Sequence, residues 1–184
     1  MMSTINVTNI KHPSSTVNNI VLASDGTCSI TGGGAILSSG TLSGDGGSGS
    51  GTVDIATFTG LDFSAATANS KLLILARTAT QEANNTSNVP NIKVQINVNG
   101  ASQIQIAGSR AGHTHGSYGP DFLIEQTINA VITPASTYRT TNVRLIFQAN
   151  LESAGSFYYG NHPSYNAFDG EGAGYQFSYI LFSE

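Results

Sequence analysis

The stretch that decides the fold is residues 92–106, IKVQINVNGASQIQI, in which apolar and polar residues alternate on both sides of Asn99-Gly100. A period of two is typical of a half-buried β-strand, because successive residues of an extended chain point to opposite faces. Asn-Gly supplies the positive φ angles that a tight turn requires. The stretch therefore predicts a β-hairpin in which each strand buries one face.

The same alternation recurs in residues 122–132, 143–149 and 175–181. Residues 72–76, LLILA, are continuously apolar, which predicts a central strand buried on both faces. No segment of ten or more residues carries a helical stripe between capping signals. We therefore expect an all-β protein, an antiparallel β-sandwich of the jelly-roll kind.

The last strand predicted by this alternation carries apolar residues on both of its faces. Tyr175, Phe177 and Tyr179 share one face, while the other turns apolar at Ile180 and Phe182. Apolar residues on two faces require a second contact, which is either a neighbouring loop or a subunit interface. The sequence leaves both alternatives open.

Residues 38–52, SSGTLSGDGGSGSGT, consist almost entirely of Gly, Ser and Thr, which is typical of a linker or a tightly supported loop. They divide the chain into an N-terminal arm, 1–37, this linker, 38–52, and a β-sandwich head, 53–184. The apolar patches of the arm are too short to form a core alone. We therefore expect the arm to gain its order from other copies, in a homotrimer, or from a larger partner.

Composition and charge exclude several classes of function. Charged residues make up 10% of the chain, the formal net charge is -4, and no basic cluster occurs, which disfavours a nucleic-acid partner. No run approaches the roughly 18 apolar residues of a membrane span, and the start of the chain lacks the pattern of a signal peptide. Cys28 is the one cysteine, so no intrachain disulfide forms.

Two histidines stand at spacing i, i+2 in the run Gly112-His113-Thr114-His115-Gly116. On an extended backbone both imidazoles project to the same side. A three-fold axis would bring three such pairs together, and six imidazoles suit a transition metal such as iron or zinc. The alternative is a pair of solvated histidines in a loop, with no cofactor.

A second candidate site is an aromatic cluster between positions 157 and 175. Aromatic rings beside amides and acids can stack on sugars and hydrogen-bond their hydroxyls. The alternative is that the rings close the end of the sandwich or pack at a subunit contact. The residues of this candidate glycan-binding or interface surface are Tyr158, Tyr159, Tyr165, Phe168, Asp169 and Tyr175.

Catalysis is not expected from this chain. A nucleophile elbow of the GxSxG type does not occur, and no constellation distinguishes the acidic residues from ordinary surface charges. We therefore expect a protein that is not an enzyme.

Residues 3–26, STINVTNIKHPSSTVNNIVLASDG, resemble a leader found on virion fibre and appendage proteins of marine, cyanophage-like tailed bacteriophages. The resemblance implies a homotrimeric structural protein, anchored to the particle through this leader and displaying its C-terminal domain outward. The run around His113 and His115 is similar to the HxH motif of trimeric phage fibre tips, which hold iron on their axis. The motif occurs once here, whereas it is repeated in those tips.

Together these observations favour a virion component, a tail-fibre or capsid-fibre protein that is assembled in the host cytoplasm and helps attach the particle to its host. Its expected partners are two further copies, other virion proteins through the arm, and a host surface glycan. One alternative is a capsid decoration protein whose arm clamps shell subunits. Another is a free carbohydrate-binding or depolymerising domain.

Overall fold

The computed structural model describes residues 9–10, 20–22, 28–30, 35–82, 90–98, 100–109, 124–151, 155–160 and 174–183. Strands dominate this part of the chain, and the helical element within it is one turn of 3₁₀ helix, η1 (Ser136–Tyr138). The prediction of an all-β protein is confirmed.

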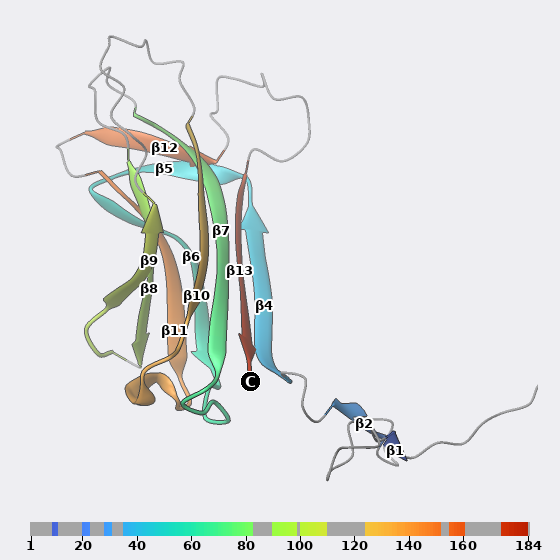
Figure 1. The fold of residues 1–184 in the computed structure, drawn as a ribbon. Coiled ribbons are helices and arrows are strands. Elements are labelled where there is room, and N and C mark those ends of the chain that lie inside the picture. Colours follow the sequence, from blue (N-terminus) through green and yellow to red (C-terminus); the bar gives the residue numbers. More distant parts are fainter. Residues whose placement is uncertain are drawn as a thin grey trace, which may run out of the picture.

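Ten strands build two antiparallel sheets that pack face to face (Figure 1). The first sheet contains β4 (Ile36–Gly44), β5 (Gly46–Ser50), β7 (Lys71–Glu82), β10 (Ile124–Ile132), β12 (Ser156–Gly160) and β13 (Tyr175–Phe182). The second has the order β6-β11-β8-β9 and contains β6 (Thr52–Leu61), β8 (Asn91–Val98), β9 (Ile104–Ser109) and β11 (Val143–Asn150).

The strand order is that of a jelly roll. β13 and β12 pair with successive parts of β7, on the side opposite β10, and β4 and β5 pair in turn with β13 and β12. If β4 and β5 are counted together as strand 1, and β12 and β13 together as strand 8, the strands of the sandwich number 1 to 8 in chain order. The first sheet then has the order 1-8-3-6 and the second has the order 2-7-4-5. Interleaving of this kind is the double Greek key, so the prediction of a jelly-roll sandwich is confirmed.

The hairpin at residues 92–106 is confirmed, and β8 buries its predicted face, but β9 has no fully buried residue and Ile104 is 54% exposed. β8 and β9 pair antiparallel, with Ile96 opposite Ile104, and Ile92, Val94 and Ile96 are buried. The backbone N–H of Ala101 donates to the carbonyl of Val98 at 2.9 Å, which closes the turn through Gly100 at φ 86°. Pairing resumes only at Ile104, so the connection is longer than a two-residue turn.

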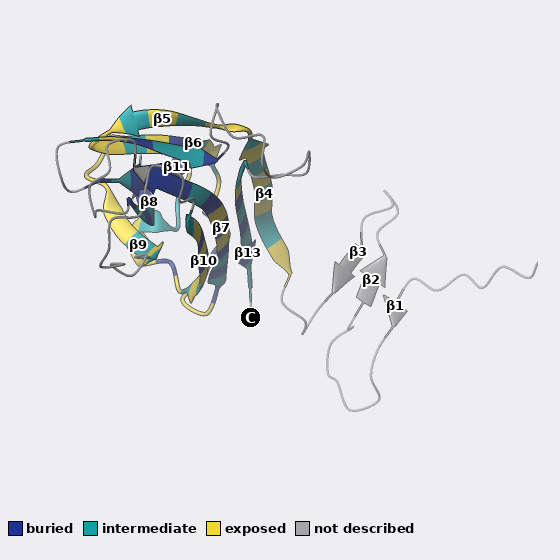
Figure 2. Cartoon of the chain, turned by 90° about the horizontal axis from the view of Figure 1, so that it is seen from above, coloured by how far each residue is buried: buried dark blue, intermediate teal, exposed yellow. Residues whose placement is uncertain are grey.

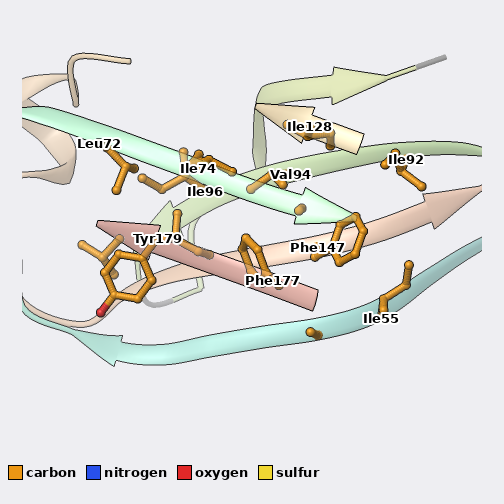
Figure 3. Packing of buried hydrophobic residues seen from close by; sticks show 14 of the residues in the cluster. Ile55, Leu72, Ile74, Ile92, Val94, Ile96, Ile128, Phe147, Phe177 and Tyr179 are labelled. Atoms are coloured by element: carbon orange, nitrogen blue, oxygen red, sulfur yellow. The ribbon is translucent and has the colours of Figure 1, made fainter. Parts of the chain in front are cut away.

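The core lies between the two sheets and is aromatic at its centre. The rings of Phe147, from β11, and Phe177, from β13, lie 5.6 Å apart and join the sheets. Phe58 from β6 meets Phe177 at 5.1 Å and Tyr179 at 4.8 Å. Figure 3 shows the aliphatic residues packed around these rings, among them Leu72, Ile74, Ile92, Val94, Ile96 and Ile128.

The structure differs from the linker predicted at residues 38–52. This stretch forms most of β4, all of β5 and the start of β6, and it lies at the edge of the first sheet. Gly/Ser-rich chains lack the side chains to bury themselves, which is why composition alone indicated a linker. In the fold, the apolar surface that orders this stretch comes from the strands beside it.

Glycines of this edge stand opposite aromatic residues of the neighbouring strands. Gly40 pairs with Tyr179, Gly44 with Tyr175, and Gly47 with Tyr159. A Cβ at Gly40 would lie 2.8 Å from the Phe58 ring and 2.9 Å from the Tyr179 ring. Such cross-strand packing of a ring over a glycine stabilises edge strands, so the rings occupy the space that side chains would otherwise fill.

We expect Gly40→Ala to lower the free energy of unfolding by about 1–3 kcal/mol, because the new methyl group overpacks two rings. The Tyr179 ring has little freedom to move, since its hydroxyl lies 2.8 Å from Ser38 Oγ. Urea unfolding followed by circular dichroism measures the change. Ser39→Ala, at the exposed neighbouring position, is the control and should change stability by less than about 0.5 kcal/mol. Equal effects of the two substitutions would contradict this account of the edge.

The N-terminal strands form a separate small sheet in which β2 (Ile20–Leu22) pairs with both β1 (Asn9–Ile10) and β3 (Cys28–Ile30). Its register aligns Ile10 with Ile20 and Ile20 with Ile30. β1, with two residues, is below the usual length of strands in globular proteins, and β2 and β3, with three each, are at its lower limit. The oligomerising role of the arm stays a prediction.

The expectation that residues 72–76 are buried on both faces is only half met. Leu72, Ile74 and Ala76 of β7 face the core, but Leu75 on the opposite face is 40% exposed. Figure 2 shows how burial divides the molecule: β11 is almost wholly buried, while the edge strands β4 and β9 mix exposed and half-buried residues and hold no fully buried one. Within the described residues, the outer face of the first sheet therefore lacks the cover that the sequence predicts.

Candidate binding surface

Three residues of the predicted aromatic cluster lie within the described structure, on adjoining parts of the first sheet. Tyr158 and Tyr159 belong to β12, and Tyr175 begins β13. The remaining members, Tyr165, Phe168 and Asp169, lie outside the described residues, as do His113 and His115 of the predicted metal site. Binding of a glycan and binding of a metal therefore stay predictions.

The half-buried rings of Tyr159 and Tyr175 cover backbone of the edge strands. A Cβ at Gly47 would lie 2.7 Å from the Tyr159 hydroxyl, and one at Gly44 would lie 2.8 Å from the Tyr175 ring. Both residues also pack against the core cluster. One side of each ring is thus occupied by the protein itself. Tyr158 takes the alternate position in β12, between Gln81 of β7 and Ser48 of β5.

A glycine corner ends β12 beside these rings. Gly160 has φ 72°, and a Cβ there would lie 2.6 Å from the carbonyl oxygen of Asp45. Its backbone N–H donates to Thr78 Oγ1 at 3.0 Å, a buried bond that fixes the corner to β7. Only glycine fits this close approach of two backbones at positive φ. Figure 1 shows β5 and β12 crossing this end of the sandwich together.

Buried amides near the same end of the sandwich differ in how they are satisfied. Gln126 Nε2 donates to Thr80 Oγ1 and to the carbonyl of Pro90, both at 2.6 Å, which links β10, β7 and the start of β8. Gln81 is only 4% exposed, yet neither its Nε2 nor its Oε1 has a hydrogen-bond partner in the described structure. Sequence analysis missed both residues, because a glutamine in an alternating strand looks like a solvated one.

On the second sheet, Gln148 of β11 is the centre of another buried polar group. Its Nε2 donates to Asp54 Oδ1 at 2.6 Å and to Gln103 Oε1 at 3.3 Å. Gln148 is 3% exposed although it lies on the face of β11 opposite to the core residue Phe147. These bonds join β6, β11 and the residue before β9, and they satisfy the Nε2 end of a desolvated amide.

Asp62, directly after β6, accepts two hydrogen bonds from Ser64. Its Oδ1 lies 2.6 Å from the Ser64 hydroxyl and 2.8 Å from the Ser64 backbone nitrogen. Hydrogen bonds to the charged form favour it, so the Ser64 hydroxyl, and after it the Ser64 N–H, hold the pKa of Asp62 below its usual value of 3.8. This is the geometry of a side-chain-stabilised turn.

Within the described ranges, no three His, Cys, Asp or Glu side chains group into a metal-binding cluster. Among the same residues, no helix has the length and apolar character needed to cross a bilayer.

The strand order and the core place the described part of the chain in the class of eight-stranded jelly rolls. No protein-family model matches the sequence, and no curated protein matches it. A chain in the structure of infectious bursal disease virus, Gx strain, is 12% identical with a TM-score of 0.34, over 100% of this chain and 42% of that chain. A chain of the infectious bursal disease virus VP2 subviral particle is 12% identical with a TM-score of 0.36, over 98% of this chain and 44% of that chain.

The chain spans less than half the length of either viral chain. At these TM-scores and identities, neither likeness carries an argument about the family or the function of this protein.

We expect Gln81→Met and Gln126→Met to change stability in opposite directions. Methionine at position 81 removes a buried amide that has no partner among the described residues and should raise the free energy of unfolding by about 1 kcal/mol. At position 126 it breaks two bonds and should lower the free energy of unfolding by about 1–3 kcal/mol. Each variant is the control for the other, since the two substitutions are identical in chemistry. Urea unfolding measures both, and a loss of stability in Gln81→Met would contradict the assignment.

We expect Ser64→Ala to raise the pKa of Asp62 towards 3.8, because the larger of the two stabilising hydrogen bonds is removed. The pKa is depressed in the folded state, so these bonds stabilise the protein above the unfolded-state pKa, and their contribution is lost as the pH falls through the folded pKa. Titration of the Asp62 carboxyl carbon by NMR measures the change. Ser64→Thr, which keeps the hydroxyl, should leave the titration of Asp62 near that of the wild type.

Proposed function

We propose that the chain is a non-enzymatic structural protein of a virion. It is a homotrimeric component of a tail fibre or capsid fibre, anchored by its N-terminal arm and displaying the jelly-roll head, which helps attach the particle to its host. The observation that carries this proposal is a jelly-roll head preceded by a segment that resembles the leader of phage fibre and appendage proteins.

The architecture supports a structural role. Jelly rolls recur in viral capsid domains and in lectin domains, which suits both assembly into a particle and contact with surface glycans. The head is held together by an apolar core between its sheets and by rings packed over glycines at one edge, while charged residues are only 10% of the chain. Rings held rigidly at one end of such a head, as Tyr159 and Tyr175 are, suit recognition of a fixed surface.

The arm supports anchoring through other chains. Its described strands are two, three and three residues long, and their aligned isoleucines make a sheet too small to bury an apolar face by itself. A segment of this kind gains order where it meets further copies or another virion protein. This is the role that the leader resemblance implies.

The test begins with the mass of the purified full-length chain by size-exclusion chromatography with light scattering. The expected result is the mass of three chains, and a monomer at all concentrations would contradict the homotrimer. Immunogold labelling of intact particles with antibodies against the chain should then mark fibres. Labelling spread evenly over the shell would instead support a capsid decoration protein.

Release of reducing ends from host envelope glycans by the purified chain would contradict the non-enzymatic assignment. Asp169→Asn is the variant to compare, because Asp169 belongs to the predicted aromatic cluster. Loss of the release in that variant would identify a depolymerising domain.

A further inference from the structure

We propose that the outer face of the sheet formed by β4, β13, β7 and β10 binds a neighbouring copy of this chain. The contact centres on an apolar patch, defined as Ile36, Leu73, Leu75, Val131, Ile180 and Phe182. The inference rests on the proposed homotrimer and names the surface that makes it.

The strand register brings the patch together from four strands. Ile180 of β13 pairs with Leu73 of β7, and Leu73 pairs with Val131 of β10, which gives a continuous apolar row across three strands. Phe182 pairs with Ile36 of β4 in the adjacent row, and Leu75 lies two residues from Leu73 on the same face. The patch is therefore a feature of the sheet and not a set of scattered residues.

Exposure shows that the patch lacks a partner in the described part of the chain. Ile36 is 66% exposed, Val131 60% and Leu75 40%. Leu73, Ile180 and Phe182 are each half-buried. Neighbouring residues of the same sheet are enough to cover a strand side chain to this extent. Contiguous apolar surface of this kind marks an interaction site on a soluble protein.

The charges around the patch favour a second copy over other occupants. The described residues place Lys71, Arg77 and Glu125 on this face, which leaves it one positive charge, while the whole chain carries -4. The rest of a copy is therefore net negative, so charge does not oppose contact between this face and another face of the same protein. A single net positive charge is too little to hold nucleic acid or an anionic lipid surface, each of which requires a basic cluster.

Contact between two different faces is the heterologous kind that closes into a ring under cyclic symmetry, as in a trimer. The size of the face also fits such a contact. Four strands about 4.8 Å apart and four rows of alternate residues about 6.7 Å apart cover about 500 Å² in projection. This is about two-thirds of the roughly 800 Å² that each partner contributes to a standard interface.

The N-terminal arm joins the sandwich at the border of the patch, where it can supply further contact area. The backbone N–H of Ser183 donates to the carbonyl of Ala35 at 2.9 Å, and the Ala35 N–H donates to Ser183 Oγ at 3.0 Å. These two bonds hold the end of the arm beside Ile36 and Phe182 (Figure 1). The patch is thus continuous with the segment proposed to oligomerise.

The test is the double variant Ile36→Glu, Val131→Glu in the full-length chain, measured by light scattering over a range of concentrations. A charge buried against an apolar surface should weaken association by about tenfold or more and shift the mass from trimer to monomer. The matched control is the double variant Ile36→Leu, Val131→Leu, which keeps both positions apolar and should keep the trimer mass. Ile104→Glu, at a position 54% exposed on β9 of the other sheet, reports whether the second face of the contact includes β9.

A labelling experiment gives an independent result if the double variant does not fold. In a Cys28→Ser background, Val131→Cys should react with a maleimide about tenfold more slowly than Ile104→Cys at a concentration where the trimer forms, and equally fast after dilution to monomer. Two results would overturn the assignment of this face without contradicting the homotrimer. One is a double variant that still has the mass of a trimer, and the other is a Val131→Cys labelling rate that is the same at both concentrations. A wild-type chain that is monomeric throughout would overturn both.

Discussion

The packing of aromatic rings over glycines is the interaction on which the architecture depends. Without Tyr179, Tyr175 and Tyr159 above them, the glycines of β4 and β5 would keep only their backbone pairing to order them, and Gly loses more conformational freedom on folding than any other residue. Without β4 and β5, the first sheet would lose one edge and the core would open beside Phe58 and Phe177. The edge and the core are therefore stabilised by the same rings.

The low charge of the chain has a structural consequence for its surface. Much of the outer face of the first sheet is polar through Ser, Thr, Asn and Gln, which are less strongly hydrated than charged side chains. The apolar patch at one end of that face is not covered by the described residues. A protein built to stay monomeric in dilute solution would place charges there. A protein built to assemble is stabilised by leaving the face apolar, so the open face of the fold is consistent with the proposed homotrimer.

Much of the fold could be predicted from alternation alone. The period of two in residues 92–106 located the β8–β9 hairpin and its buried face, and the same pattern located β10, β11 and β13. The linker prediction failed because composition describes what a segment can bury by itself and not what neighbouring strands can bury for it. Of the predicted aromatic surface, alternation placed Tyr175 on a strand but did not place Tyr158 and Tyr159, and the packing of Tyr159 and Tyr175 over glycines could not be predicted.

The sequence by itself determined the β class, the strands and which face of most strands is buried, because these follow from side-chain alternation along an extended backbone. Only the tertiary structure decided the pairing between distant strands, and with it three features: the role of Gly40, Gly44 and Gly47, the contrast between Gln81 and Gln126, and the open face around Leu75. Each of these depends on which residue lies across from another. That choice is made by the register of strands far apart in the chain, which alternation within a single strand does not specify.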